Sequence, residues 1–423
     1  MPPLDGKRNL FQGSRLSGST RERGTGLGGL IARRLVPPAG AGHADVWIQG
    51  VSVGEVELAF TLALALRAER PGLPLLVTST TPAGVDLLGR RFRALSPPAR
   101  LQPFPLDLPP SVRRLLDSAS PRLLVLVETE LWPVLLRSAG RRGLPVLVAS
   151  GRISERAARR IRAAGRLFFG PLAALSAVAA RSPEDAARFA AAGVPERRIV
   201  VAGDMKFDRP LPPEPPFAGD VRALAGGRPV VVAGSIAEEE LDLALSLPRR
   251  LASHGGAPFL LLAPRRPETW DDAAGRASAA GLRVARRSAG RADGPADVFL
   301  LDTIGELASA YRLGDVALLG GTFGRRGGHN VLEPLQVGLP VVVGPSITGI
   351  RRAVEAAGDA VLRATDGEEA VAALARLLAA PELRRSAAGA AAALFTRHRG
   401  ATARTARLAL DLLDGRAPAG GPA

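Results

Sequence analysis

The chain has 423 residues, and 46% of them are apolar, which is enough to build the cores of about two or three domains. Its 56 basic and 40 acidic residues give a net charge of +16, carried almost entirely by arginine, and this charge suits an anionic partner such as a nucleotide, an acidic membrane surface or nucleic acid. The lack of cysteine excludes disulfides and thiolate metal sites, and no apolar run reaches the roughly 18 residues of a membrane-spanning helix.

The first 44 residues are rich in glycine, serine, proline and arginine, so we predict a mostly irregular basic arm without the apolar core of a signal peptide. From residue 45 to residue 209, short apolar runs alternate with helical patterns, which predicts a first α/β domain. A weaker strand candidate, interrupted by proline, is Leu101–Leu106. The other expected strands of this domain are Val46–Gly50, Leu75–Ser79, Leu123–Val127, Val146–Ala149, Ala177–Ala180 and Ile199–Ala202.

Five prolines in residues 210–216 indicate a stiff linker, which we place at residues 210–220. The alternation of strands and helices resumes over residues 221–397, which predicts a second α/β domain, followed by a C-terminal helix and tail at residues 398–423. Two doubly wound, Rossmann-like domains facing a cleft are therefore expected, with ligands at the carboxyl ends of the strands. The expected strands of the second domain are Pro229–Ala233, Phe259–Ala263, Val298–Leu301, Asp315–Leu319 and Leu339–Val343.

The glycine-rich stretch Gly320–Pro334 lies between a predicted buried strand and a predicted helix. Free N–H groups of a glycine loop and a helix N-terminus favour an anion, so we predict a phosphate or nucleotide site here. Asn330 is a good N-cap, and Glu333 follows at the spacing of a capping box, so the same residues also fit a well-capped helix after a flexible loop. Further candidate ligand contacts in the stretch are Gly327, Gly328, His329, Arg325 and Arg326.

Carboxylates follow two of the predicted strands of the first domain. Ser52 and Glu55 come after the first strand, where Glu55 is either a proton acceptor at the cleft or the acid of a capping box. Glu128 and Glu130 follow a later strand, and their spacing of two places both on one face of an extended segment. The alternative is that they are acids favoured by the dipole at a helix N-terminus.

Several cations and hydroxyls at other strand ends are candidates for substrate binding. Arg152 is a candidate partner for a carboxylate or phosphate, although a solvated arginine is the simpler interpretation in this arginine-rich chain. Lys206, one of two lysines, stands next to the linker, within reach of the cleft. The histidines are too scattered for a metal site, so none is predicted. Candidates for contact with a donor phosphate are Gly234, Ser235 and Arg265.

Eight motifs over about residues 46–345 resemble, in the same order, those of the 3-deoxy-D-manno-octulosonic acid (Kdo) transferases of lipopolysaccharide assembly. The narrowest of them is Gly-Gly-His-Asn-x-x-Glu-Pro at residues 327–334. The eight segments are Val51–Glu55, Thr78–Pro82, Val127–Pro133, Gly151–Glu155, Gly203–Asp208, Pro264–Glu268, Asp302–Glu306 and Gly327–Pro334.

The resemblance implies a GT-B fold and an inverting transfer of Kdo from CMP-Kdo to a lipid A precursor, without a cofactor. It implies that Glu55 is the general base and that either Glu128 or Glu130 is a second essential acid. It also implies that the segments around Ser235, Arg265 and Asn330–Glu333 hold CMP. In many GT-B proteins the C-terminal helix packs back on the first domain, so the same is expected here after about Arg397.

The sequence departs from the family at three places. Members commonly begin with an apolar membrane anchor, which is lacking here, so we predict peripheral attachment to the cytoplasmic face of the inner membrane through the basic arm. Val331 replaces a usual proline, and Ile236 replaces a usual threonine. Two other functions are kept as alternatives, a GT-B enzyme using a UDP-sugar and a basic nucleic-acid binder. The second is disfavoured because aromatic residues make up 4% of the chain and no stacking motif stands out.

Overall fold

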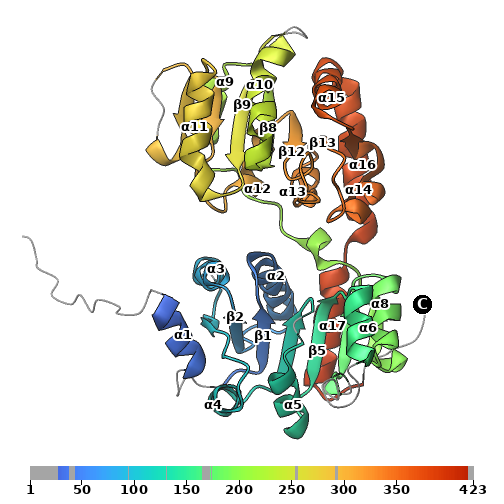
Figure 1. Cartoon of the computed structure of the whole chain (residues 1–423). Coiled ribbons are helices and arrows are strands. Elements are labelled where there is room, and N and C mark those ends of the chain that lie inside the picture. Colours follow the sequence, from blue (N-terminus) through green and yellow to red (C-terminus); the bar gives the residue numbers. More distant parts are fainter. Residues whose placement is uncertain are drawn as a thin grey trace, which may run out of the picture.

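The computed structural model describes residues 27–37, 43–93, 95–129, 131–163, 172, 174–252, 256–290 and 294–417. Within these residues the chain forms two parallel sheets of seven strands each, and apolar cores lie on both faces of each sheet. The helices lie on either side of the two sheets (Figure 1). The predicted α/β class with two doubly wound sheets is confirmed.

The first sheet has the strand order β3-β2-β1-β4-β5-β6-β7, and its pairings are parallel. Its central strands are near-continuous runs of valine, leucine and isoleucine because both of their faces are covered by helices. The strands are β1 (Val46–Gly50), β2 (Leu75–Ser79), β3 (Arg100–Pro103), β4 (Leu123–Val127), β5 (Val146–Gly151), β6 (Ala177–Ala180) and β7 (Ile199–Val201).

The second sheet has the order β10-β11-β9-β8-β12-β13-β14, and it too is parallel. Two of its strands, β10 and β14, were not predicted, because each has three residues, ends in arginine and lies at an edge of the sheet. The strands are β8 (Val230–Ile236), β9 (Phe259–Pro264), β10 (Val284–Arg286), β11 (Val298–Leu300), β12 (Val316–Leu319), β13 (Val341–Val343) and β14 (Val361–Arg363).

Many of the helices begin with proline in the first turn, where its missing N–H is not needed for the helix. The helices of the first half are α2 (Val53–Glu69), α3 (Pro82–Phe92), α4 (Pro109–Ala119), α5 (Pro133–Arg141), α6 (Glu155–Ala163) and α8 (Pro183–Ala191). Those that follow are α9 (Ala218–Ala225), α10 (Leu241–Ala252), α11 (Trp270–Ala279), α12 (Leu307–Ala310), α13 (Leu332–Gln336), α14 (Arg351–Ala357), α15 (Gly367–Ala379), α16 (Pro381–His398) and α17 (Ala401–Leu413).

The chain crosses back to the first sheet at its C-terminal end. Phe395 of α16 belongs to the core of the second sheet, whereas Ala406 and Ala409 of α17 belong to the core of the first. Figure 1 accordingly shows α17, in red, among the elements of the first half, and α17 packs against α2. The two halves are therefore joined twice, by the proline-rich segment and by the step from α16 to α17.

In each sheet the strand order reverses at the middle, and a doubly wound sheet binds its ligands at such a point. In the first sheet this point lies between β1 and β4, and in the second between β8 and β12. The loops at the carboxyl ends of the two sheets approach each other, since Arg352 at the start of α14 contacts Ser182 at 3.4 Å and Glu184 at 3.5 Å, both at the start of α8. The GT-B arrangement of two facing Rossmann-like sheets follows.

A helix, α1 (Leu27–Leu35), lies inside the stretch for which the sequence predicted an irregular arm. The N–H of Leu106 donates to the carbonyl of Arg34 at 2.8 Å, and the hydroxyl of Ser111 donates to the carbonyl of Leu35 at 2.6 Å. Docking on the first domain thus stabilises a helix that is too short to be stable alone. No helix within the described ranges is long and apolar enough to cross a membrane.

Candidate functional site

Glu55 lies in the first turn of α2, directly after β1 at the reversal point of the first sheet. Its Oε2 accepts the N–H of Val51 at 2.5 Å, and its Oε1 accepts the hydroxyl of Ser52 at 3.1 Å. Ser52 is the N-cap residue, but its side chain does not cap the helix. The predicted capping box is therefore incomplete, and Glu55 is held by donors that would serve equally to orient a base.

Burial raises the pKa of the Glu55 carboxyl above its usual value, and the nearby Glu128 carboxylate raises it further. The hydrogen bonds from Val51 and Ser52 act in the opposite direction without cancelling the rise. A helix N-terminus favours the ionised form of a carboxyl group, but burial outweighs that effect at Glu55. A carboxylate with a raised pKa is a better proton acceptor near neutral pH.

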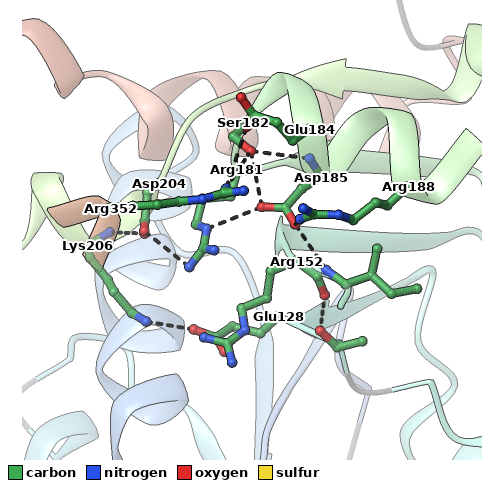
Figure 2. Close-up of polar contacts among 12 residues, drawn as sticks. Glu128, Arg152, Arg181, Ser182, Glu184, Asp185, Arg188, Asp204, Lys206 and Arg352 are labelled. Atoms are coloured by element: carbon green, nitrogen blue, oxygen red, sulfur yellow. Dashed lines mark hydrogen bonds and ion pairs between the residues drawn. The ribbon is translucent and has the colours of Figure 1, made fainter. Parts of the chain in front are cut away.

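Glu128 follows β4 and adopts a left-handed backbone conformation with φ of 62°, which is strained for a residue with a side chain. The Nζ of Lys206 lies 2.9 Å from its Oε1, and the Nε of Arg152 lies 3.5 Å from its Oε2 (Figure 2). The hydroxyl of Thr129 donates to the carbonyl of Arg152. The structure thus brings together three predicted site residues from the ends of β4, β5 and β7, while Glu130 lies outside the described residues.

A buried aspartate supports the loop that carries Arg152. Asp185 accepts the N–H of Ile153 at 3.3 Å and the guanidinium of Arg188 at 3.2 Å. Arg181 lies between Asp185 and Asp204, at 3.5 Å and 3.7 Å (Figure 2). These contacts order the carboxyl ends of β5, β6 and β7, and so they fix the positions of Arg152 and Lys206 beside Glu128.

The glycine loop after β12 closes around a buried glutamate that the sequence analysis missed. Glu240 is 2% exposed, and its Oε1 accepts the N–H of Phe323 at 2.8 Å. Its Oε2 accepts the N–H groups of Gly321 at 2.7 Å and Ala237 at 2.8 Å. The N–H groups of Gly321 and Phe323 are therefore not free to bind a ligand. Glu240 belongs to a run of three glutamates, and no pattern distinguishes it from its neighbours.

At three glycines in the predicted site, a side chain would collide with neighbouring protein atoms. A Cβ on Gly327 would lie 2.4 Å from the Thr348 hydroxyl, and a Cβ on Gly328 would lie 2.6 Å from Ile350. A Cβ on Gly234 would lie 2.0 Å from the hydroxyl of Tyr311, a buried residue on the helical segment after α12.

Asn330 and Glu333 interact directly, but not as a capping box. The Nδ2 of Asn330 donates to Oε1 of Glu333 at 2.8 Å, and its Oδ1 accepts the N–H of Leu332 at 3.2 Å. The helix begins at Leu332, so Asn330 is not its N-cap. Although Glu333 is partly exposed as a residue, its carboxyl group is buried, and burial raises its pKa, opposed first by the charge of Arg209.

Arg265, His329 and Ser235 complete this part of the site. Ser235 has a left-handed backbone with φ of 57°, and the N–H of Arg265 donates to the carbonyl of Ile236 at 2.9 Å. Burial lowers the pKa of His329 to about 4, with help from the charges of Arg265 and Arg326, so its ring is neutral at pH 7. The Nε2 of His329 is buried and has no hydrogen-bond partner among the described residues.

The other two described histidines make contacts of their own. His398 stacks on Phe207 with 4.5 Å between ring centroids, His43 pairs with Asp45, and His254 lies outside the described residues. In the part of the chain that the structure describes, no group of three or more histidines and carboxylates could hold a metal ion.

A family model described as 3-deoxy-D-manno-octulosonic-acid transferase (kdotransferase) matches residues 26–209. A 3-deoxy-D-manno-octulosonic acid transferase of Bordetella pertussis is 40% identical over 371 residues, which is 86% of each chain. The chain belongs to the Kdo transferase family. A Kdo transferase of Haemophilus influenzae is 32% identical over 312 residues, 73% of this chain and 71% of that one.

Among solved structures, the fold resembles a putative UDP-N-acetylglucosamine 2-epimerase from Listeria monocytogenes, with a TM-score of 0.60. The match covers 90% of this chain and 100% of that one, at 12% identity, so it shows the shared two-domain fold alone. Membership in the Kdo transferase family makes the chain a glycosyltransferase, as the sequence motifs predicted.

Proposed function

We propose that this Kdo transferase moves Kdo from CMP-Kdo to a lipid A precursor with inversion at the anomeric carbon. The observation that carries the proposal is the pairing of two unlike sites at the reversal points of two facing sheets. Glu55 and Glu128 lie on one side, Glu333 lies on the other, and the charges of Arg209 and Glu57 from the first half act on the Glu333 carboxyl. Acceptor activation on one side and donor binding on the other fit this division.

Glu55 is the proposed general base. It removes the proton from an acceptor hydroxyl, whose oxygen then bonds to the anomeric carbon of Kdo as the bond from that carbon to the CMP phosphate breaks. The proton ends on the Glu55 carboxylate, and the electron pair leaves with CMP. Arg265 is proposed to stabilise the negative charge of the departing phosphate, since its charge acts on both His329 and Glu333.

Lys206 and Arg152 are proposed to bind the carboxylate of Kdo or a phosphate of the acceptor. Both cations are partly exposed and both already contact Glu128, which holds them in place before substrate arrives. Holding charged groups in advance removes the cost of reorganising them during the reaction. The strained backbone of Glu128 is consistent with this role, since such strain is often stored at functional sites.

The donor pocket is proposed to comprise Ser235, Arg265, His329 and Asn330–Glu333. Glu333 is a suitable acceptor for ribose hydroxyls, because its carboxyl is buried and is held at one oxygen by Asn330. His329 is neutral at pH 7, so it offers a hydrogen-bonding ring nitrogen rather than a charge. Gly327, Gly328 and Gly234 shape the loops around this pocket through protein contacts.

The direct test is to incubate the purified protein with CMP-Kdo and a lipid A precursor and to follow the lipid by mass spectrometry. We expect a mass increase corresponding to one or more Kdo residues, with release of CMP. A UDP-sugar replaces CMP-Kdo in a parallel reaction. Transfer or turnover with the UDP-sugar but not with CMP-Kdo would contradict the proposed donor.

We also propose that the N-terminal arm, including α1, contacts an anionic membrane surface. Ile31 and Leu35, four residues apart on α1, are 48% and 47% exposed, and Leu108 beside the helix is 47% exposed. Arg33 is exposed on the same short helix, and each surface cation adds about 1 kcal/mol of attraction to an anionic leaflet. The apolar side chains and the arginine together fit an interfacial contact.

Liposome binding at low salt tests this contact. Deletion of residues 1–40 should abolish binding to vesicles that contain an anionic lipid, and Ile31→Asp with Leu35→Asp should weaken it while leaving the arm in place. Binding that persists in the deletion variant would show that the arm is not the attachment. Normal transfer to a detergent-dispersed acceptor would confirm that the substituted protein is folded.

A further inference from the structure

A four-residue helical turn, η3 (Met205–Asp208), lies between the cores of the two halves. Met205 is buried in the core of the first sheet, whereas Phe207 is buried in the core of the second, against Phe395 at 5.3 Å between ring centroids. Asp208 accepts the N–H groups of Gly400 and Thr402 at 2.7 Å and 2.6 Å, at the start of α17. This turn therefore lies next to both segments that connect the halves: it directly precedes the proline-rich segment, and it binds the start of α17.

Arg209 follows this turn and touches both sides of the proposed active site. Its Nη2 donates to the carbonyl of Gly54 at 3.2 Å, and Gly54 directly precedes Glu55. Its own carbonyl accepts Nε2 of Gln336 at 2.5 Å, and Gln336 is the last residue of α13, the helix that carries Glu333. One residue thus links the loop of the proposed base to the helix of the proposed donor pocket.

The charge of Arg209 also reaches the donor side. Among the charged groups that act on the Glu333 carboxyl, Arg209 has the largest effect on its pKa and lowers it, against the rise caused by burial. Glu57, one turn into α2, acts in the opposite direction. The positive charge of Arg209 therefore offsets the effect of Glu57, which belongs to the same half, on the pKa of Glu333 in the other half.

The side chain of Arg209 is not explained by fold stability alone. Its Nε is buried and has no hydrogen-bond partner among the described residues. Leaving such a donor unpaired costs about 1–3 kcal/mol, so a shorter or apolar side chain would suit the fold better. Local choices that disagree with stability are expected at functional positions.

We propose that Arg209 is a positioning residue that ties the Val51–Glu55 loop to α13, so that the base and the donor pocket are assembled in one relative geometry. The proposal rests on the function proposed above, since it assigns the two sides to acceptor and donor. Arg209 acts through its side-chain hydrogen bond to the Gly54 carbonyl, through the hydrogen bond of its own carbonyl with Gln336, and through its charge on Glu333.

The test compares Arg209→Gln with Arg312→Gln in the full-length protein. Arg312 is a matched control, because its Nη1 donates to the carbonyl of Pro212 at 3.2 Å and it is exposed. In the ligand-free protein, Arg209→Gln should speed amide hydrogen exchange in both residues 51–58 and residues 330–337, and Arg312→Gln in neither. Faster exchange in one segment alone, or equal effects of the two variants, would overturn the proposal.

A second measurement uses CMP affinity from calorimetry. Arg209→Gln should weaken CMP binding about 10-fold, and Arg209→Lys should restore part of the loss because it keeps the charge. In a Glu333→Gln background, Arg209→Gln should cause little further loss, because the interaction is already removed. Full additivity, or unchanged CMP affinity with a lowered melting temperature, would mean that Arg209 is merely structural.

The two proposals fail in different ways. If the wild-type protein neither binds CMP nor transfers Kdo, the proposed function is wrong, and the exchange measurement on ligand-free protein still decides whether Arg209 couples the two segments. If the wild-type protein transfers Kdo, but Arg209→Gln matches it in both amide hydrogen exchange and CMP affinity, then only the inference about Arg209 is wrong.

Discussion

The two halves of the site are built in opposite ways. On the first sheet, charged side chains from separate loops contact one another, as in the pairing of Glu128 with Lys206 and Arg152. On the second sheet, backbone closes on itself, with the N–H groups of Gly321 and Phe323 used by the buried Glu240. The first half presents charged side chains, whereas the second presents a loop whose backbone is held by a buried carboxylate.

This difference teaches where substitutions should act. Removing a charge from the first half should impair the chemical step and leave CMP affinity intact. Substitutions in the second half should impair donor affinity or loop stability before they affect chemistry. A substitution in one half that also changes the property assigned to the other half, as we expect for Arg209, identifies a residue that connects the halves.

The largest effect is expected for Glu55→Gln. If Glu55 is the base, turnover should fall by about 10²–10⁴-fold, while melting temperature and CMP affinity stay close to wild type. Glutamine keeps the acceptor oxygen that a capping role needs, so a cap would tolerate it. Single-turnover transfer, thermal melting and calorimetry on one preparation distinguish the two roles.

Glu155→Gln is the matched control, because Glu155 is also an acid in the first turn of a helix that follows a strand, and it is exposed. It should retain wild-type turnover. Near-normal transfer by Glu55→Gln would remove Glu55 as the base and would direct attention to Glu128 and Glu130.

The next effect is expected for Glu333→Ala, on the opposite side of the division. Loss of a charged hydrogen bond to the ribose should weaken CMP binding by about 1.5–3 kcal/mol. The rate constant of the chemical step at saturating donor should change much less than the affinity. If calorimetry finds unchanged CMP affinity, Glu333 serves the local structure through Asn330 and does not contact the donor.

The sequence predicted the fold well because its strongest signals are local. Runs such as Leu123–Val127 mark buried strands. The edge strands β10 and β14 escaped prediction because three residues carry too little pattern. The helix α1 escaped because its stability comes from contacts with residues about 70 positions away.

The site was predicted unevenly for a related reason. Residue type and position after a strand identified Glu55, Glu128 and Lys206 as candidates, and the structure places them at the carboxyl ends of β1, β4 and β7. A local sequence pattern does not show which distant group a side chain will bind through a hydrogen bond. Glu240 lies 81 residues before the loop that it holds, so the sequence could not show that the loop N–H groups are already used.

A smaller effect, on stability, is expected for Glu240→Gln. The amide has a single acceptor oxygen, so at least one of the three N–H groups would face an NH₂ group inside the protein. Leaving a buried donor unpaired should cost about 1–3 kcal/mol of unfolding free energy. The measurement is denaturant unfolding, with CMP affinity as a second readout of loop geometry.

The neighbouring Glu239 provides the control, since it is 44% exposed and pairs with Arg326 at 3.2 Å. Glu239→Gln should cost less than about 1 kcal/mol, as expected of a surface ion pair. Equal losses in the two variants would contradict the view that Glu240 supports the loop from within.

The smallest effect is expected for the pH dependence of stability through His329. Its pKa is lowered from 6.5 to about 4 in the folded state, so the unfolded chain binds a proton at this residue between these values while the native protein does not. Stability should therefore fall as pH decreases from about 6.5 towards 4. His329→Gln removes this proton linkage, so its melting temperature should fall less steeply over the same range. The cause is mainly burial, hence added salt should change the slope little. Parallel melting curves for wild type and variant across this range would show that the folded and unfolded states take up this proton at the same pH, which would contradict a lowered pKa of His329.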